Sequence, residues 1–141
     1  MKRHASAHWQ GDLKTGKGSI SMESGALKDA PYGFSTRFES AQGTNPEELV
    51  AAAHAGCFTM ALSAELEKAG IVAQSLRTTC TVTLDKVAEG FAITASHLDL
   101  VGKIPGASSD AFLTAAHTAE VNCPMSKLLK AKITLDARLE G

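Results

Sequence analysis

The sequence has no run of basic residues, and its charges almost cancel. Its 14 Lys and Arg residues are balanced by 15 Asp and Glu residues, which gives a formal net charge of −1 and a pI near 6.5. Such a protein has no field that would hold phosphate backbones. We therefore expect no nucleic-acid partner.

An apolar segment near the N-terminus is also missing. Lys2 and Arg3 resemble the start of a signal peptide, but residues 4–14 are polar. A signal peptide or a membrane anchor needs an apolar stretch after such a start. We expect a cytoplasmic protein without a membrane partner.

Cysteines are few. Cys57, Cys80 and Cys123 are too scattered for a disulfide framework. A reducing compartment keeps such residues as thiols unless chemistry oxidises them, so any disulfide should be transient.

A nucleotide-binding loop is incomplete. Gly11, Gly16 and Lys17 reproduce most of a phosphate-binding loop, but Gly18 stands where Ser or Thr would hold magnesium, and no helix start follows. We expect no cofactor. The 141 residues, 44% of them hydrophobic, indicate one compact domain over residues 1–141.

A long apolar stretch over residues 43–70 dominates what is present. Asn45 is a typical helix cap, Pro46 suits the first helical position, and Glu47 and Glu48 place negative charge at the positive end of the helix dipole. The following residues are almost all small or apolar, without the wide polar face of a surface helix. The pattern predicts a long, buried central helix.

Strands and shorter helices are predicted around this helix. The alternation of apolar and polar residues indicates strands, and one of these strands should contain a bulge near His97. Ser108 or Ser109 can cap a later helix. Together they predict an α+β fold with antiparallel sheets wrapped around the central helix. The strands are expected at residues 4–9, 17–21, 33–39, 76–84, 91–101 and 133–139, and the helices at residues 110–121 and 124–130.

Cys57 is the first candidate for chemistry. A free cysteine in an apolar helix is most often a small core residue. However, Gly56 directly before it weakens a helix by roughly 1 kcal/mol, which is often compensated by the close approach of a backbone or ligand. Both readings stay open from the residues alone.

Cys123 is the second candidate. Asn122 can cap and Pro124 fits a first helical turn, which would put the thiol where a helix dipole favours the thiolate. The alternative is a packed turn cysteine. Cys80 lies on the apolar face of a strand, and we expect it to be structural.

His54 lies on the same helix face as Cys57. It could act as a base for that thiol, as in a Cys-His hydrolase or acyltransferase, or form part of a zinc site. Two ligands do not make a metal site, and a satisfied buried histidine is the plain alternative. Arg37 by itself indicates a surface charge on an edge strand, and Glu47 and Glu48 indicate capping.

Several motifs in order resemble the OsmC/Ohr family of thiol peroxidases, and among its members the osmotically inducible protein C branch. The likeness covers nearly the whole chain. The main motifs are PYGFSTRF at residues 31–38, GTNPEEL at 43–49, AAHAGCF at 52–58 and CPMS at 123–126; AHWQGD at 7–12, LDKV at 84–87 and ITLD at 133–136 match the branch.

The resemblance implies a cysteine-based peroxidase that reduces organic hydroperoxides and, less efficiently, hydrogen peroxide. Cys57 matches the peroxidatic cysteine and Cys123 the resolving one, while Arg37 and Glu47 match the residues that activate the thiolate and orient the peroxide. Glu48 then keeps the capping role. The resemblance also implies an intertwined homodimer, and a dihydrolipoyl or thioredoxin-like dithiol as reductant.

The spacing of Glu47 and Cys57 poses a geometric question. Ten residues of unbroken helix rise about 15 Å, more than a glutamate and an arginine comfortably span. Either the helix breaks near residues 54–56, or Glu47 serves Cys57 of the partner subunit. We favour the second alternative, in which Glu47 serves the partner subunit. We also expect Cys57 to be the more deeply buried of the two thiols and to lie beside a guanidinium.

Overall fold

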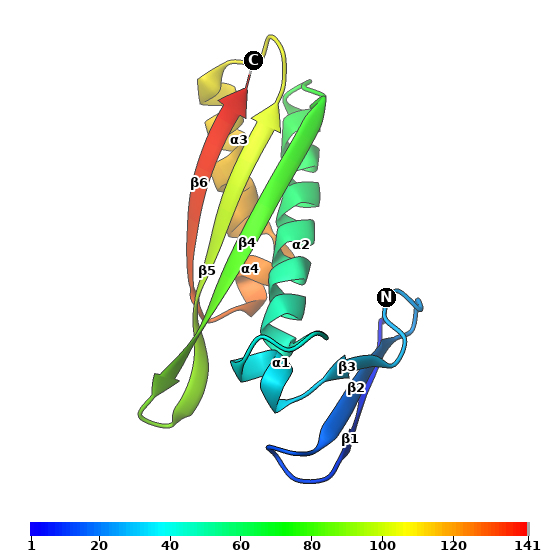
Figure 1. The fold of residues 1–141 in the computed structure, drawn as a ribbon. Helices are drawn as coiled ribbons and strands as arrows, with labels where there is room; N and C mark the ends of the chain where they lie inside the picture. The colour runs from blue at the N-terminus through cyan, green and yellow to red at the C-terminus, as the bar shows by residue number, and fades with distance from the viewer. Residues whose placement is uncertain (141) are drawn as a thin grey trace. The chain divides into compact units, whose positions relative to one another are not determined.

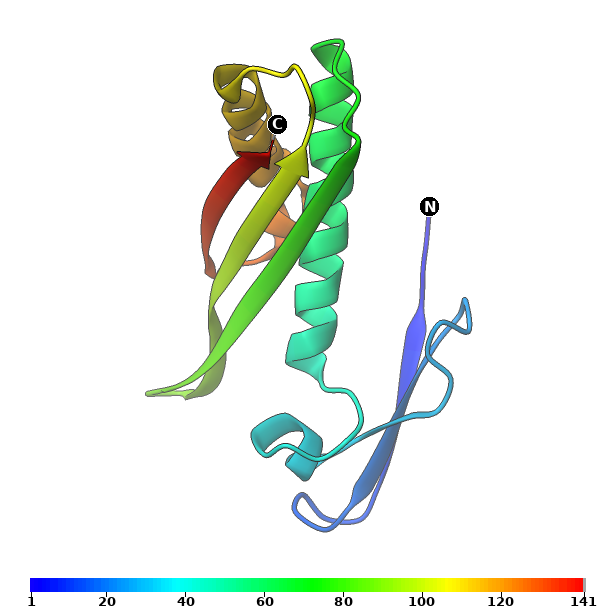
Figure 2. The same cartoon turned by 45° about the horizontal axis from the view of Figure 1, so that its top comes forward.

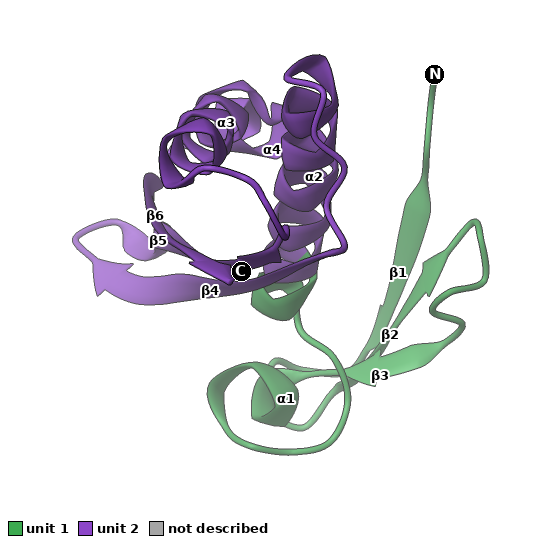
Figure 3. Ribbon diagram, turned by 90° about the horizontal axis from the view of Figure 1, so that it is seen from above, with its two compact units in different colours: residues 1–49 green, residues 50–141 purple. Residues whose placement is uncertain are grey.

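The computed structural model describes residues 1–140, and the chain divides into two compact units, Met1–Leu49 and Val50–Gly141 (Figure 3). The prediction of a single domain over residues 1–141 stays a prediction. The elements run in the order β1 Ala5–Gln10, β2 Lys17–Met22, β3 Ala30–Tyr32, α1 Phe34–Phe38, α2 Pro46–Lys68, β4 Ser75–Val87, β5 Gly90–Lys103, α3 Ser109–Asn122, α4 Pro124–Leu128 and β6 Lys132–Glu140 (Figure 1).

The first unit holds a three-stranded antiparallel sheet in the order β1-β2-β3. The predicted strand over residues 33–39 is wrong, because those residues form the short helix α1. The Thr36 hydroxyl accepts a hydrogen bond from the Gly33 N–H at 2.8 Å, and the Arg37 N–H donates to the Gly33 carbonyl at 3.1 Å. These local bonds close a helical turn that outweighs the β-propensity of the two phenylalanines.

The second unit holds a three-stranded sheet in the order β4-β5-β6. β4 and β5 form an antiparallel hairpin, whereas β5 and β6 pair in parallel. This pairing differs from the predicted antiparallel sheets, and its cause is the crossover through α3 and α4 that parallel neighbours require. Both helices lie on the same face of the sheet as α2 (Figures 1 and 2).

The predicted bulge in β5 exists, but it lies before His97. Thr83 pairs with Ala95, whereas Leu84 pairs with Ile93, so Thr94 is the extra residue. The bulge turns Ser96, Leu98 and Leu100 toward the core.

α2 is continuous from Pro46 to Lys68, so the predicted alternative of a break near residues 54–56 is wrong. The Asn45 side chain accepts a hydrogen bond from the Glu48 N–H at 2.7 Å, as its predicted capping role requires. The residues buried in the single chain form one stripe, His54, Phe58, Leu62 and Leu66.

The other faces of α2 are less buried than its composition predicts. Met60, for example, is 78% exposed. The length and mean hydropathy of α2 also meet the minimum for a membrane span, a test that core helices of other proteins pass as well.

The core of the second unit lies between α2, α3 and β5. The α3 cap at Ser108 forms as predicted, with its hydroxyl accepting from the Ala111 N–H at 3.1 Å, and the apolar stripe of this helix is buried. The core side chains are Phe58, Leu62 and Leu66 of α2; Leu98 and Leu100 of β5; Ile104, which follows β5; Phe112, Ala115, Ala116 and Ala119 of α3; and Cys123.

Candidate active site

Cys57 and Cys123 are brought together in the second unit. Cys57 lies in α2, and Cys123 lies between the end of α3 and the start of α4. The Cys57 thiol forms a hydrogen bond with Cys123 and another with the Met125 backbone N–H. This contact places the two thiols beside each other, and both cysteines are reduced in the structure.

The position of Cys123 follows from the sequence around it. Its N–H still donates to the Ala119 carbonyl at 2.9 Å, which closes the last turn of α3, and Pro124 then starts α4. Cys123 itself is the N-cap residue, whereas Asn122, the predicted cap, is the last residue of α3. The predicted helix over residues 124–130 ends at Leu128.

Cys123, not Cys57, is the more deeply buried thiol, so the prediction of their relative burial is wrong. Cys123 is 0% exposed and belongs to the core, while Cys57 is half-buried. Cys57 is therefore the thiol that a small molecule can reach from solvent.

The surroundings of Cys57 in the single chain favour its neutral form. Burial is the main cause that raises the pKa of the Cys57 thiol, and the hydrogen bond with Cys123 raises it further. The Met125 N–H acts in the opposite direction because it stabilises the thiolate. Activation at neutral pH therefore needs a positive charge in addition to these groups.

Arg37 and Glu47 form an ion pair within the first unit. Arg37 Nε and Nη2 donate to the same carboxylate oxygen, Glu47 Oε1, at 2.9 and 2.7 Å. The contact between the guanidinium and the carboxylate therefore uses one carboxylate oxygen and not two. The Glu47 side chain is only 13% exposed, so its carboxylate is held in place by its surroundings. Its charge-assisted hydrogen bonds then hold the guanidinium at the start of α2.

Glu48 has contacts of its own at the start of α2. Its Oε2 accepts a hydrogen bond from the Thr44 hydroxyl at 3.0 Å, and its N–H is capped by Asn45. These contacts belong to the helix start, which leaves Glu47 as the partner of Arg37.

Arg37 also borders an apolar cavity of the first unit. The cavity has a volume of about 200 Å³, and the guanidinium carbon lies 5.4 Å from the centre of the Phe38 ring. Its lining residues are Trp9, Leu13, Tyr32, Gly33, Phe34, Arg37 and Phe38.

His54 is fully buried and hydrogen-bonded through both ring nitrogens. Nδ1 lies 2.6 Å from the Ser96 hydroxyl, and Nε2 lies 2.9 Å from the Ser126 hydroxyl. Burial lowers the pKa of His54, opposed by the negative charge of Glu120. The satisfied buried histidine that the sequence offered as the plain alternative is what the structure contains.

Cys80 joins the same polar cluster on the side away from α4. Its sulfur lies 3.1 Å from the Ser96 hydroxyl and 3.8 Å from His54 Nδ1, and burial raises the pKa of its thiol. Sequence reasoning did not find Ser96 or Ser126 as partners of His54. Ser126 closes the CPMS motif, but nothing in the sequence links it to residue 54.

Metal binding finds little support among residues 1–140. No group of three or more His, Cys, Asp or Glu side chains in this part of the chain could hold a metal ion. His54 and Cys57 thus lack the further ligands that a zinc site needs.

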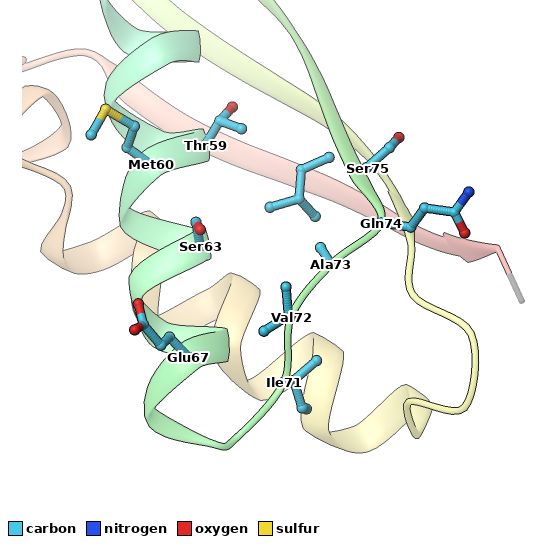
Figure 4. Close-up of a pocket in the computed structure, with 10 residues that line it drawn as sticks. Thr59, Met60, Ser63, Glu67, Ile71, Val72, Ala73, Gln74 and Ser75 are labelled. Atoms are coloured by element: carbon cyan, nitrogen blue, oxygen red, sulfur yellow. The ribbon is translucent and has the colours of Figure 1, made fainter.

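A second hollow lies beside α2 in the second unit (Figure 4). It has a volume of about 520 Å³, and neither Cys57 nor Cys123 lines it. It contains the exposed Met60 and Val72. The lining residues are Thr59, Met60, Ser63, Glu67, Ile71, Val72, Ala73, Gln74, Ser75 and Leu76.

A profile of the OsmC-like protein family matches residues 39–138 of the chain. The chain belongs to the OsmC-like family. It is 51% identical over 141 residues to proteins called Peroxiredoxin OsmC from Escherichia coli (strain K12) and Shigella flexneri, covering 100% of this chain and 99% of each relative. The predicted family and branch are thereby confirmed.

Solved structures share the fold. An OsmC-like protein of unknown function from Vibrio cholerae has a TM-score of 0.78 at 15% identity, over 97% of this chain and 99% of the other. An organic hydroperoxide resistance protein OsmC from Legionella pneumophila has a TM-score of 0.71 at 23% identity, over 100% and 98%. The predicted α+β, OsmC-like fold is confirmed.

The identity to the two peroxiredoxins over the full length also confirms the predicted activity class. This OsmC-like chain is a peroxiredoxin-type, thiol-dependent peroxidase.

Proposed function

We propose that this peroxidase reduces organic hydroperoxides, and hydrogen peroxide less efficiently, with Cys57 as the peroxidatic and Cys123 as the resolving cysteine. The observation that carries the assignment is the hydrogen bond between these two thiols, one half-buried and one fully buried. A peroxidatic thiol must be reachable by the substrate, and a resolving thiol must lie beside it.

In the first step, the Cys57 thiolate attacks the outer oxygen of the hydroperoxide. The O–O bond breaks, the sulfur is oxidised to sulfenic acid, and the leaving alkoxide takes up a proton to become the alcohol. In the second step, the Cys123 sulfur attacks the sulfenic sulfur. A disulfide forms, and the hydroxyl of the sulfenic acid leaves with the Cys123 proton as water.

Arg37 and Glu47 supply the positive charge that Cys57 lacks in its own unit. A fixed guanidinium lowers the pKa of a nearby thiol and stabilises negative charge on the departing oxygen. Because α2 is continuous and rises about 15 Å between residues 47 and 57, we propose that the ion pair serves Cys57 of the partner subunit.

An intertwined homodimer would make this arrangement possible. Much of the apolar surface of α2 is uncovered in the single chain, including Met60, and the adjoining Val72 is 86% exposed. Exposed apolar side chains beside a hollow of this size are typical of a subunit interface.

Substrate and reductant follow from the same chemistry. The aromatic cavity beside Arg37 suits the hydrocarbon part of an organic hydroperoxide, which hydrogen peroxide does not have.

A dithiol of the dihydrolipoyl or thioredoxin-like class would reduce the disulfide by exchange and leave as its own disulfide. Such a cycle suits the cytoplasm, where we propose that the protein works.

The alternative of a Cys-His hydrolase or acyltransferase has no supporting contact. Both ring nitrogens of His54 are engaged by serine hydroxyls, so this ring is not positioned as a base for Cys57. A zinc-binding module likewise lacks ligands among the described residues.

The proposal is tested by consumption of cumene hydroperoxide with a dithiol, comparing the wild type with Cys57→Ser and Cys80→Ser. We expect Cys57→Ser to abolish turnover and Cys80→Ser to keep it. Retained turnover in Cys57→Ser would exclude the assigned peroxidatic cysteine.

A further inference from the structure

The buried His54 ring connects three elements of the second unit. It lies in α2, its Nδ1 contacts Ser96 of β5 at 2.6 Å, and its Nε2 contacts Ser126 of α4 at 2.9 Å. A buried ring with both nitrogens bonded cannot rotate without leaving a polar atom unpaired, which costs about 1–3 kcal/mol. The ring therefore fixes α4 to α2 through Ser126.

This link is next to the thiol pair on both of its elements. His54 lies three residues, or about one helical turn, before Cys57 in α2. Ser126 lies in α4, whose N-cap residue is Cys123, and the Met125 N–H beside Ser126 bonds the Cys57 sulfur. α4 has only five residues, so one side-chain anchor can set the position of its whole first turn.

The protonation state of His54 is compatible with this role. A neutral imidazole donates through one nitrogen and accepts through the other, and a serine hydroxyl can do either. The burial that lowers the pKa of His54 keeps the ring neutral, so its place in the cluster does not change near neutral pH. The charged groups that face it include Glu120 of α3, and the thiol of Cys80 faces it from β4.

We propose that His54 is a positioning residue for disulfide formation, holding the start of α4 through Ser126 so that the Cys123 thiol meets the Cys57 sulfenic acid. The inference rests on the proposed function. The step that it controls is the condensation in which the Cys123 sulfur bonds to Cys57, and the hydroxyl leaves with the Cys123 proton as water.

A competing reaction makes the position of Cys123 measurable. A second hydroperoxide can oxidise the Cys57 sulfenic acid to sulfinic acid and leave as its alcohol. The ratio of sulfinic acid to disulfide compares the two rates within the same folded molecules. A residue that only stabilises the fold would not change this ratio.

The test compares Ser126→Ala with the wild type, at a temperature where both are folded. Reduced protein is treated with increasing cumene hydroperoxide, and mass spectrometry measures the sulfinic acid and disulfide forms. We expect Ser126→Ala to raise the ratio about 3- to 10-fold, as the loss of one hydrogen bond implies.

Two further variants serve as controls. Ser126→Thr keeps the hydroxyl and should behave as the wild type. Thr78→Val removes a hydrogen bond of 2.7 Å between β4 and Thr59 of α2, which is comparable in kind but does not involve α4, and should leave the ratio unchanged.

The possible failures are distinguishable. A ratio in Ser126→Ala equal to that of the wild type, or an equal rise in Thr78→Val, would overturn the positioning role alone. A wild type that forms no bond between Cys57 and Cys123 would overturn the proposed function and this inference together.

Discussion

The thiols of Cys57 and Cys123 share a hydrogen bond, and within their own unit this bond adds to burial in raising the pKa of the Cys57 thiol. This arrangement favours the step in which Cys123 forms the disulfide more than the step in which Cys57 attacks the peroxide. A thiol with a raised pKa is mostly protonated at pH 7 and reacts slowly with peroxides. The first step therefore needs a positive charge, which we propose that the Arg37 guanidinium supplies.

The first prediction concerns Arg37. Arg37→Met should raise the pKa of Cys57 by about one unit or more, because it removes the charge that stabilises the thiolate. The thiolate fraction at pH 7 would fall about tenfold, and peroxide reduction would slow with it. The pH dependence of Cys57 alkylation by iodoacetamide measures this shift directly.

Arg77→Met on β4 is the matched control, because it removes the same charge from a strand outside the proposed site. Its alkylation profile should match that of the wild type. Identical profiles for Arg37→Met and the wild type would contradict the role of Arg37.

The second prediction concerns Cys123. Cys123→Ser should reduce the first equivalent of hydroperoxide at the normal rate, since Cys57 keeps its thiol. It should then lose turnover as Cys57 accumulates as sulfinic acid, because no neighbouring thiol traps the sulfenic acid. A burst experiment followed by mass spectrometry checks both parts; sustained turnover with a dithiol would count against a resolving role.

The sequence predicts much of this protein where one local signal dominates. The Asn45 and Ser108 caps and the alternation along β4 appear as predicted, because capping and half-buried strands depend on neighbouring residues. The sequence predicts a strand where α1 lies, because residue propensities do not reveal the turn that the Thr36 side chain closes.

Long-range contacts mark the limit of sequence reasoning. The parallel pairing of β6 depends on the path through α3 and α4, and the contacts of His54 join residues of three distant elements. The local sequence makes Cys57 and Cys123 candidates without deciding their roles, whereas Arg37 and Glu47 follow only from the family resemblance.

The third prediction concerns pH and His54. Because burial lowers the pKa of His54 in the folded chain, the unfolded chain binds this proton first as the pH falls below about 6.5. His54 therefore favours folding above that pH, and stability declines below it, with a slope of up to about 1.4 kcal/mol per pH unit until the folded pKa is reached. Urea unfolding between pH 7.5 and 5.5 measures the slope.

His54→Gln should flatten part of this dependence, whereas His8→Gln, at an exposed position of β1, should not. An unchanged slope in His54→Gln would show that other groups cause the decline.

The fourth prediction contrasts two glycines. A Cβ atom at Gly102 would lie 2.5 Å from the Phe112 ring, which is fully buried, so Gly102→Ala should destabilise the second unit by about 1–3 kcal/mol. A Cβ atom at Gly56 would meet nothing within 4 Å, so the close approach that the sequence suggested at Gly56 is absent in the single chain. Gly56→Ala should stabilise α2 by about 0.5–1 kcal/mol. Denaturant midpoints compare the two, and a stabilising Gly102→Ala would refute the packing around Phe112.

The most direct test of the whole account is to identify the bond that forms when the reduced protein receives one equivalent of cumene hydroperoxide. Peptide mass spectrometry under non-reducing conditions should find Cys57 joined to Cys123, with Cys80 still a thiol. A disulfide that includes Cys80, or an oxidised Cys57 that never bonds to Cys123, would contradict it.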